Sequence, residues 1–260
     1  MKIFSTLRAM ARECGASFRL GGDLRSRLRL ATDFVLSHAI FALPAGMINR
    51  ERQITTASGV KISYRMNRGD LQGIREVWCD QVYRLPFVVA KGALLDLGAN
   101  IGLTTLWMAT HGQFSSVIAV EPDENNAALV EKNLRQNNIS CKILEAAVGP
   151  TDGVAYFAKN SWSNQGHLSD AGTSVRLVSV ASILKEFDIE KFSLVKVDIE
   201  GGEEALFLGP KEWLARTEAM IVEFHPDMVD YPLLTKTVAA SGLEYIPASA
   251  NNMDIFVRRG

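Results

Sequence analysis

The chain has 260 residues, and its 28 Lys and Arg residues nearly balance its 29 Asp and Glu residues. Hydrophobic residues make up 47% of the sequence, which is enough to bury one substantial α/β core with an N-terminal appendage. A net charge of −1 argues against a general nucleic-acid-binding protein, because such proteins normally carry a basic excess.

Cysteine content and hydropathy bear on the compartment. The cysteines are odd in number and lack C-x-x-C spacing, which argues against a disulfide framework and fits a reducing compartment. No apolar signal core follows Met1, and polar residues and a proline interrupt the apolar stretch 30–48. We therefore expect a cytoplasmic protein without a secretory signal or a transmembrane segment. The cysteines are Cys14, Cys79 and Cys141.

Residues 1–60 differ in character from the rest and are expected to form a basic, partly apolar helical extension. The first 30 residues hold seven basic and two acidic residues. A solvated helical face is the simpler interpretation, and contact with an anionic lipid surface or a phosphorylated carrier is the alternative. The sequence leaves the oligomeric state open. The arginines concerned are Arg8, Arg12, Arg19, Arg25, Arg27 and Arg29.

A second region, residues 61–260, is expected to form the main domain. Residues 60–66 predict a strand, and residues 69–85 predict a helix that carries Trp78 and Tyr83. These two aromatic side chains are expected either to pack on the sheet or to line the entrance of a pocket.

Residues 94–102, LLDLGANIG, predict a strand, a glycine turn and the start of a helix. The apolar run ends in Asp96, and Gly98, Asn100 and Gly102 follow. In an open parallel sheet, ligands bind beyond the carboxyl ends of the strands, at turns of this kind. Gly98 can adopt backbone angles denied to other residues and lets a ligand come close, and Gly102 lets the helix start approach the strand.

Asp96 indicates which ligand this turn favours. A dinucleotide fingerprint reads G-x-G-x-x-G and holds a diphosphate at the helix N-terminus, but only two of its three glycines can be aligned here. An acid at the mouth of the strand also repels a diphosphate and suits a cationic ligand. S-adenosylmethionine has an amino group and a sulfonium and no phosphate, so the turn favours it. A βα turn with a capping acid is the simpler alternative.

Glu121 ends the next apolar strand, residues 117–122, and lies 25 residues after Asp96. A carboxylate at the tip of the second strand can accept both hydroxyls of a ribose. A helix is expected to follow, and residues 139–148 predict a third strand. At the end of that strand, the small Ala146 and Ala147 leave room for an adenine ring.

Two further apolar runs are typical of parallel strands buried on both faces. The first run is followed by Asp198 and Glu200, and the second ends in Glu223 and His225. Each of these residues alone is typical of a solvated strand end or a helix cap. Their occurrence at consecutive strand tips is more than a packed core needs and indicates a functional site.

With these motifs the chain resembles the FkbM-type methyltransferases, which are S-adenosylmethionine-dependent enzymes of the class I methyltransferase fold. The most family-specific pattern is Lys-x-Asp-x-Glu-Gly, which begins here at Lys196. The resemblance covers residues 92–260, extends weakly over residues 69–85 and does not reach the first 60. The matching segments are LLDLGANIGLTTL (94–106), AVEPDENNAALVEKNL (119–134), AAVGPTDG (146–153), LVKVDIEGGEEALFLG (194–209) and IVEFHP (221–226).

The resemblance implies an α/β, doubly wound, Rossmann-like sheet of seven strands, of which the last is antiparallel. Residues 245–248 and 252–259 are expected to form the closing pair. The resemblance also implies S-adenosyl-L-methionine as the cofactor. The expected cofactor contacts are Asp96, Gly98, Ala99, Asn100, Gly102, Glu121, Pro122 and Ala147.

The expected reaction is in-line transfer of a methyl group from the sulfonium to an acceptor oxygen, in which positioning supplies much of the rate. An alcohol acceptor must also lose its proton. His225 is a candidate base because an unperturbed imidazole titrates near pH 6.5. Asp198 or Glu200 can serve instead, or can orient the histidine. The resemblance implies a hydroxyl on a sugar, a polyketide or a related small molecule or glycan.

Two other hypotheses remain open beside this metal-free reaction. One is a metal-assisted methyltransferase with Asp198, Glu200, Glu223 and His225 as ligands. The other is a binding module that retains the cofactor fold without turnover, although the intact acids at the strand tips argue against it.

Residues 158–173 are polar and form a long connection, which is typical of binding loops. Trp162 and His167 are the candidate acceptor contacts in this segment, and a flexible surface loop is the alternative. We expect the segment and the region from Trp78 to Tyr83 to form the walls of the acceptor pocket.

Overall fold

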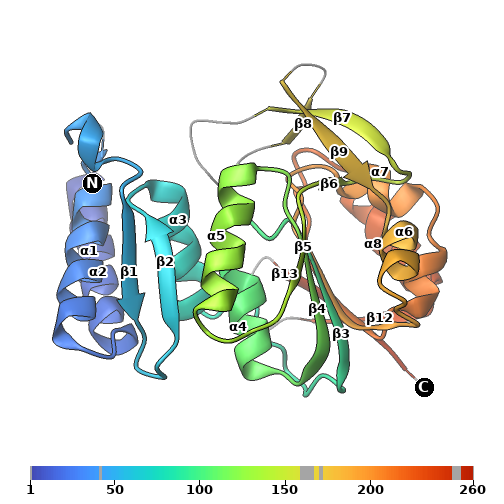
Figure 1. The fold of residues 1–260 in the computed structure, drawn as a ribbon, viewed down its shortest axis with the longest axis horizontal. Helices are drawn as coiled ribbons and strands as arrows, with labels where there is room; N and C mark the ends of the chain where they lie inside the picture. Colours follow the sequence, from blue (N-terminus) through green and yellow to red (C-terminus); the bar gives the residue numbers. More distant parts are fainter. Residues whose placement is uncertain (1, 41–42, 159–166, 170–171, 248–252, 260) are drawn as a thin grey trace.

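The computed structural model describes the chain except for residues 1, 41–42, 159–166, 170–171, 248–252 and 260. Seven strands form one sheet (Figure 1), and in spatial order they are β12 (Leu243–Ile246), β13 (Met253–Arg258), β11 (Ala219–Glu223), β10 (Phe192–Val197), β3 (Gly92–Leu97), β4 (Phe114–Val120) and β5 (Lys142–Leu144). The strands from β11 to β5 are parallel, and β13 runs antiparallel to both of its neighbours. The predicted seven-stranded α/β sheet with an antiparallel last strand is confirmed.

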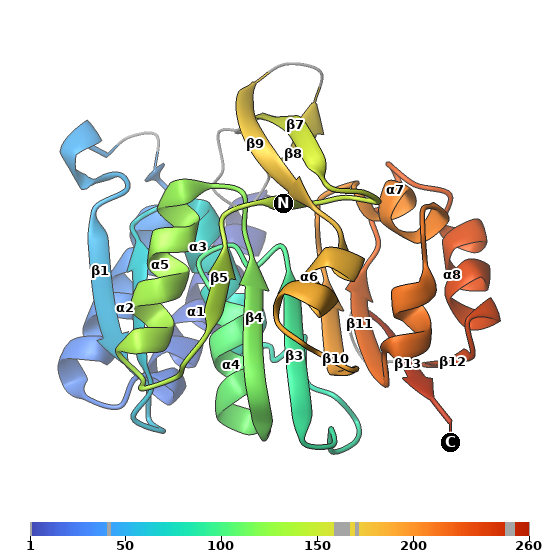
Figure 2. The same cartoon turned by 45° about the vertical axis from the view of Figure 1, so that its right-hand side comes forward.

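The central strands are mostly apolar because both faces of the sheet are covered. Successive side chains of a strand point to opposite faces, so Leu94 and Leu95 of β3 belong to two different core clusters. The first cluster packs α4 (Leu103–His111) and α5 (Glu124–Arg135) on one face. The second packs the helices of the other face (Figure 2), which are α6 (Val180–Glu186), α7 (Glu203–Leu208), η4 (Glu212–Arg216) and α8 (Tyr231–Ala240).

In the described part of the N-terminal extension, two helices and a short 3-10 turn lead into a β-hairpin. The proposed division between residues 60 and 61 falls inside this hairpin, in which Thr55 pairs with Lys61. The hairpin is attached to α5, because the Asn133 side chain hydrogen-bonds both the N–H and the carbonyl of Ser63. The elements are α1 (Lys2–Leu20), α2 (Leu24–Ser37), η2 (Ala45–Met47), β1 (Glu51–Thr55) and β2 (Lys61–Arg65).

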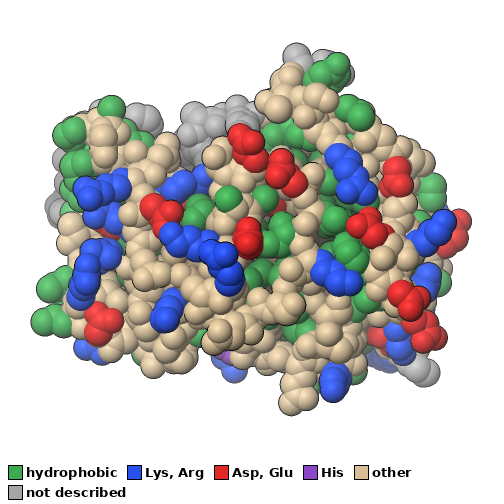
Figure 3. Space-filling model, viewed as in Figure 1, with side chains coloured by type: hydrophobic (Ala, Val, Ile, Leu, Met, Phe, Trp, Pro, Cys, Tyr) green, Lys and Arg blue, Asp and Glu red, His purple; other side chains and the backbone are tan. Residues whose placement is uncertain are grey.

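The surface of this N-terminal part is rich in cations. Figure 3 shows Lys and Arg side chains gathered over the part of the visible face that contains the hairpin. Several arginines are already used within the fold, since Arg12 pairs with Asp80 and Arg29 donates to the Gln53 carbonyl. Among the described residues, no helix has the length and hydropathy needed to cross a membrane, and the cysteines are free thiols.

The predicted helix over residues 69–85 is shorter in the structure. It consists of α3 (Arg68–Ile74) and a π-helical turn, η3 (Arg75–Cys79), after which the chain continues without helical structure to Tyr83. Such turns are frequent at functional sites, because the wider helix re-aims the side chains that follow. Asn67 caps the start of α3, where its side chain accepts a hydrogen bond from the Asp70 N–H.

The predicted third strand and the loop that follows it differ from expectation. The segment 139–148 is split, because the chain leaves the main sheet after β5 and enters a second sheet at β6 (Ala147–Val148). The expected loop 158–173 is part of that second sheet at both ends. The remaining strands of the second sheet are β7 (Gly153–Ala158), β8 (His167–Ser169) and β9 (Thr173–Val178), in the order β6-β9-β7-β8.

Candidate active site

A cavity of about 560 Å³ opens at the carboxyl ends of the parallel strands. Its walls combine the turn after β3, the tips of β4, β10 and β11, and residues from α3 and η3. This volume is in the range of pockets that enclose a small organic ligand. The position agrees with the general rule that ligands of open α/β sheets bind beyond the carboxyl ends of the strands.

The glycine turn after β3 is held in a left-handed conformation. Gly98, Asn100 and Gly102 have φ angles of 80°, 50° and 79°. A Cβ atom on Gly98 would lie 1.8 Å from the carbonyl oxygen of Asp198, so this glycine lets the tips of β3 and β10 meet. Gly102 lies close to Val130 of α5 rather than to a strand, which corrects the packing role that we expected for it.

Asp96 is fully buried below this turn and does not line the cavity. Its Oδ1 atom lies 3.1 Å from Nζ of Lys196, and its Oδ2 atom accepts a hydrogen bond of 2.5 Å from the Thr105 hydroxyl. The carboxylate is therefore neutralised inside the protein, which corrects the expectation that it faces a cationic ligand directly. Its role is to hold Lys196, which does line the cavity.

Lys196 connects the tips of β3 and β10. Its ammonium donates a hydrogen bond of 2.6 Å to the Gly98 carbonyl, and Asp198 lies 3.7 Å away. Burial opposes the charge of this ammonium, but Asp96 and Asp198 outweigh it and raise the pKa of Lys196, so the group stays protonated. The lysine thus fixes the backbone of the glycine turn.

Glu121 is buried at the tip of β4 and lines the cavity. One carboxylate oxygen accepts from the Asn100 N–H at 2.8 Å, and the other accepts from the Asp123 N–H and the Asn126 amide. A carboxylate has about four acceptor positions, so these three bonds leave one for a ligand donor. Burial raises the pKa of Glu121 to about 7, against the lowering effect of these hydrogen bonds.

The wall beside Glu121 is small and apolar. Pro122, Ala146 and Ala147 line it, as expected from the sequence, and Phe157 of β7 adds an aromatic ring. A flat heteroaromatic group fits such a surface, because aromatic faces favour offset stacking. Asn100 lies on the same turn, and its side-chain oxygen is buried without a hydrogen-bond partner in the described part of the chain.

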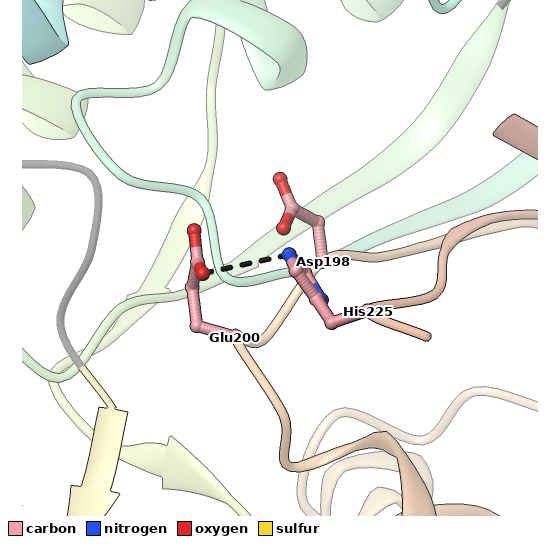
Figure 4. Close-up of side chains that lie close together, drawn as sticks. All are labelled: Asp198, Glu200 and His225. Carbon is pink, nitrogen blue, oxygen red and sulfur yellow. Dashed lines mark ion pairs between the residues drawn. The ribbon is translucent and has the colours of Figure 1, made fainter. Parts of the chain in front are cut away.

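Asp198, Glu200 and His225 converge at the other end of the cavity (Figure 4). The imidazole Nε2 lies 3.4 Å from a Glu200 oxygen, and Nδ1 lies 2.9 Å from Oε1 of the fully buried Glu203. Asp198 accepts a hydrogen bond of 3.2 Å from the Tyr83 hydroxyl. β3 lies between β10 and β4, so Asp198 at the tip of β10 is separated from Glu121 by two strand spacings, which is about 10 Å.

Burial and neighbouring charges shift the pKa values of the residues at this end of the cavity. The hydrogen bond to Glu203 raises the pKa of His225 to about 9, although partial burial opposes the shift. Burial raises the pKa of Glu200 to about 7, and the charge of Asp198 adds to this effect. Burial and Asp198 also raise the pKa of Glu223. His225 is therefore a cation at neutral pH, which argues against the expected role as a base.

The pKa of His225 predicts how stability changes with pH. Its folded-state pKa of about 9 lies above the usual imidazole value near 6.5, so its contribution to stability is fully present below about pH 6.5. That contribution is lost as the pH rises through about 9. We expect the difference in unfolding free energy between wild type and His225→Gln, measured with urea in metal-free buffer, to shrink over this interval. An equal difference in unfolding free energy at pH 6.5 and above pH 9 would contradict the raised pKa of His225.

Most of the predicted site residues line the cavity. These are Gly98, Ala99, Asn100, Glu121, Pro122, Ala147, Asp198, Glu200 and His225, whereas Asp96 and Gly102 do not line it. Trp78 packs in the core near His111 and is also absent from the wall. Trp162 lies outside the described residues, and His167 begins β8.

The sequence predicted no site role for Lys196 and Phe157, and it predicted Glu223 only as a possible metal ligand. Tyr83 was expected either to pack on the sheet or to line the pocket, and in the structure it is buried in the cavity wall. Lys196 was visible as the first residue of the Lys-x-Asp-x-Glu-Gly pattern. For Phe157, the alternation in β7 is a weak signal, because most side chains of that strand are exposed or half-buried.

Comparisons with known proteins give one family match and several distant likenesses. A family model described as the methyltransferase FkbM domain matches residues 96–239. The chain is 23% identical over 196 residues to the AMB antimetabolite synthetase AmbE of Pseudomonas aeruginosa, with 58% of this chain and 9% of that protein covered. The chain therefore spans less than a tenth of the length of this relative.

Two of the solved structures to which the chain is similar are the following. The methyltransferase FkbM from Methylobacillus flagellatus KT is 14% identical, with 97% of this chain and 60% of that chain covered and a TM-score of 0.49. TrmK of M. capricolum, solved in complex with S-adenosyl-homocysteine, is 9% identical, with 68% of this chain and 65% of that chain covered and a TM-score of 0.40.

Proposed function

The chain belongs to the methyltransferase FkbM family, and from this premise we propose that it transfers the methyl group of S-adenosylmethionine to a hydroxyl oxygen. The cofactor is S-adenosylmethionine, which when bound supplies an electrophilic methyl group on a sulfonium. The proposed acceptor is a sugar, a polyketide or a related metabolite. The observation that carries the proposal is the cluster of acids at the tips of β10 and β11, at the other end of the cavity from Glu121.

The cavity fits this cofactor. Glu121 offers a buried acceptor position to a ribose hydroxyl, and the apolar wall with Phe157 suits the adenine. The buried side-chain oxygen of Asn100 offers a further acceptor to the nucleoside part of the ligand. Asp198, Glu200 and Glu223 concentrate negative charge at the opposite end, where a sulfonium is favoured. The ribose is thus expected at β4 and the methyl group at β10.

Glu223 is the carboxylate best placed to take the acceptor proton. It lines the cavity, and its raised pKa makes it a stronger base than an ordinary carboxylate. The other acids have partners, since Asp198 accepts from Tyr83 and Glu200 faces the imidazolium of His225. Glu223 makes no hydrogen bond or ion pair with another described side chain. We assign it the proton, while the cluster orients the hydroxyl in line with the methyl group.

The function is tested by methyl transfer from labelled cofactor. The purified chain is incubated with S-adenosylmethionine carrying a deuterated methyl group and with a panel of hydroxylated sugars and polyketides. We expect one labelled methyl group on an oxygen of one acceptor class, and an equal amount of S-adenosylhomocysteine, by mass spectrometry. Labelling of nitrogen or carbon alone would refute the proposed acceptor atom. Cofactor binding without transfer to any acceptor would favour the binding-module hypothesis.

Replacing Glu121 by Ala is expected to weaken cofactor binding by tenfold or more. A hydrogen bond to a charged group contributes about 1.5–3 kcal/mol, and 1.4 kcal/mol corresponds to a factor of about ten. Calorimetric titration with S-adenosylhomocysteine measures the change. Glu124→Ala is the matched control, because Glu124 is an exposed acid three residues away that does not line the cavity. Unchanged affinity in Glu121→Ala would remove this residue from the ribose site.

A further inference from the structure

We propose that Asp198, Glu200 and His225 bind a divalent cation at the acidic end of the cavity. One carboxylate oxygen from each acid and one imidazole nitrogen lie within 4.8 Å of one another. Ligands of an ion with bonds of about 2.1 Å lie roughly 3 to 4 Å apart, so small side-chain movements close the site. Figure 4 shows the three side chains directed toward a common point from the loop after β10 and from the end of β11.

The imidazole of His225 is held in the orientation of a metal ligand. Its Nδ1 atom lies 2.9 Å from the carboxylate of Glu203, which is fully buried at the start of α7. Metal-binding histidines commonly donate their second ring N–H to a carboxylate in this way, which fixes the tautomer. The other nitrogen, Nε2, faces Glu200 at 3.4 Å and presents its lone pair toward the cluster when the ring is neutral.

Carboxylates outnumber cationic side chains around Asp198, Glu200 and His225, so the cluster can accommodate a cation. Glu203 and Glu223 add two carboxylates to those of Asp198 and Glu200. Lys196 is shared between two carboxylates, because its ammonium lies 3.1 Å from Asp96 and 3.7 Å from Oδ2 of Asp198. Among the described residues, the four carboxylates of the cluster are therefore balanced only by His225 and by part of the Lys196 charge. A divalent ion relieves their repulsion, and the contact of His225 with the buried Glu203 is the arrangement that metal-binding histidines commonly have.

The donor set indicates the class of ion. Two carboxylates and one imidazole suit a first-row transition ion such as Mn²⁺, because imidazole nitrogen is a poor ligand for Ca²⁺ and Mg²⁺. Three protein ligands leave coordination positions open toward the cavity. If the proposed function holds, a hydroxyl of the acceptor fills one of them, where the ion favours loss of its proton to Glu223. The binding of the ion itself does not depend on that role.

Binding of Mn²⁺ alone tests the site without any acceptor. The full chain is stripped with a chelator, dialysed and titrated with Mn²⁺, with free Mn²⁺ followed by electron paramagnetic resonance. We expect one ion per chain, and at least a tenfold loss of affinity in Glu200→Gln and in His225→Gln. Glu190→Gln is the matched control, because Glu190 is an exposed acid at the amino end of β10 and should bind as wild type.

Two results would overturn the site. One is the absence of stoichiometric Mn²⁺ binding by wild type, and the other is equal binding by wild type and both cluster variants. An unchanged far-UV circular dichroism spectrum shows that both variants are folded. Methyl transfer is assayed separately: loss on chelation and recovery with Mn²⁺ support the role of the ion, whereas undiminished transfer after chelation overturns it. Mn²⁺ binding in a chain that methylates no hydroxyl would refute the proposed function and leave the metal site standing.

Discussion

Replacing Lys196 by Met is expected to lower the free energy of unfolding by about 3–5 kcal/mol, because it leaves a buried carboxylate without its countercharge. Asp96 is 0% exposed and Lys196 is 2% exposed, so water cannot replace the lost ammonium. The Gly98 carbonyl also loses its hydrogen bond to Nζ. Urea denaturation at neutral pH measures the loss as a lower midpoint at unchanged slope.

Two companion variants make this result specific. Lys191→Met removes an exposed lysine that pairs with Glu218 and should leave the midpoint nearly unchanged, because water screens such a pair. The double variant Lys196→Met with Asp96→Asn should recover much of the loss, since the uncompensated charge is gone. A loss below about 1 kcal/mol in the single variant would contradict the view that this pair holds the two strand tips together.

Replacing Glu223 by Gln is expected to lower turnover about a hundredfold while leaving the affinity for S-adenosylhomocysteine, which carries no sulfonium, nearly unchanged. Removal of a general base typically costs that factor or more, and Gln keeps the shape of the side chain. The raised pKa of Glu223 also predicts that the wild-type rate increases with pH through the titration of this group. That rising limb should be absent in the variant.

His225 is the alternative candidate for the general base, and the pH dependence of turnover distinguishes it from Glu223. If His225 were the base, the rate would keep increasing up to about pH 9, the pKa that its bond to Glu203 imposes. Glu223→Gln would then retain turnover within a few-fold of wild type and the same profile. Glu218→Gln serves as the control, because this acid lies at the amino end of β11 and does not line the cavity.

The tips of the parallel strands could be located from the sequence because a strand buried on both faces is continuously apolar. A polar residue lies at or next to the end of such a run, as Asp96 and Glu121 show for β3 and β4. In β10 the buried Lys196 interrupts the apolar run one residue before the strand ends, and Asp198 follows the strand. The antiparallel closing pair followed from the resemblance to a known family rather than from periodicity. These signals were enough to predict the fold and the side of the sheet on which the cavity opens.

Contacts between residues of different strands could not be predicted from the sequence, because they depend on which strands become neighbours in the sheet. Asp96 and Lys196 are 100 residues apart, and only the pairing of β3 with β10 makes them an ion pair. The prediction that Asp96 faces the ligand was therefore wrong, although its predicted position at the carboxyl end of β3 was right. The second sheet was missed for a different reason, since β7 is exposed or half-buried at most positions and gives little apolar periodicity.

The most direct test of the account is a crystal structure of the chain with bound S-adenosylhomocysteine. We predict a ribose hydroxyl within hydrogen-bond distance of the Glu121 carboxylate, the adenine against Ala147 and Phe157, and the sulfur directed toward Asp198 and Glu223. A nucleoside bound outside this cavity, or one with its sulfur at the Glu121 end, would contradict the proposed assignment of the site.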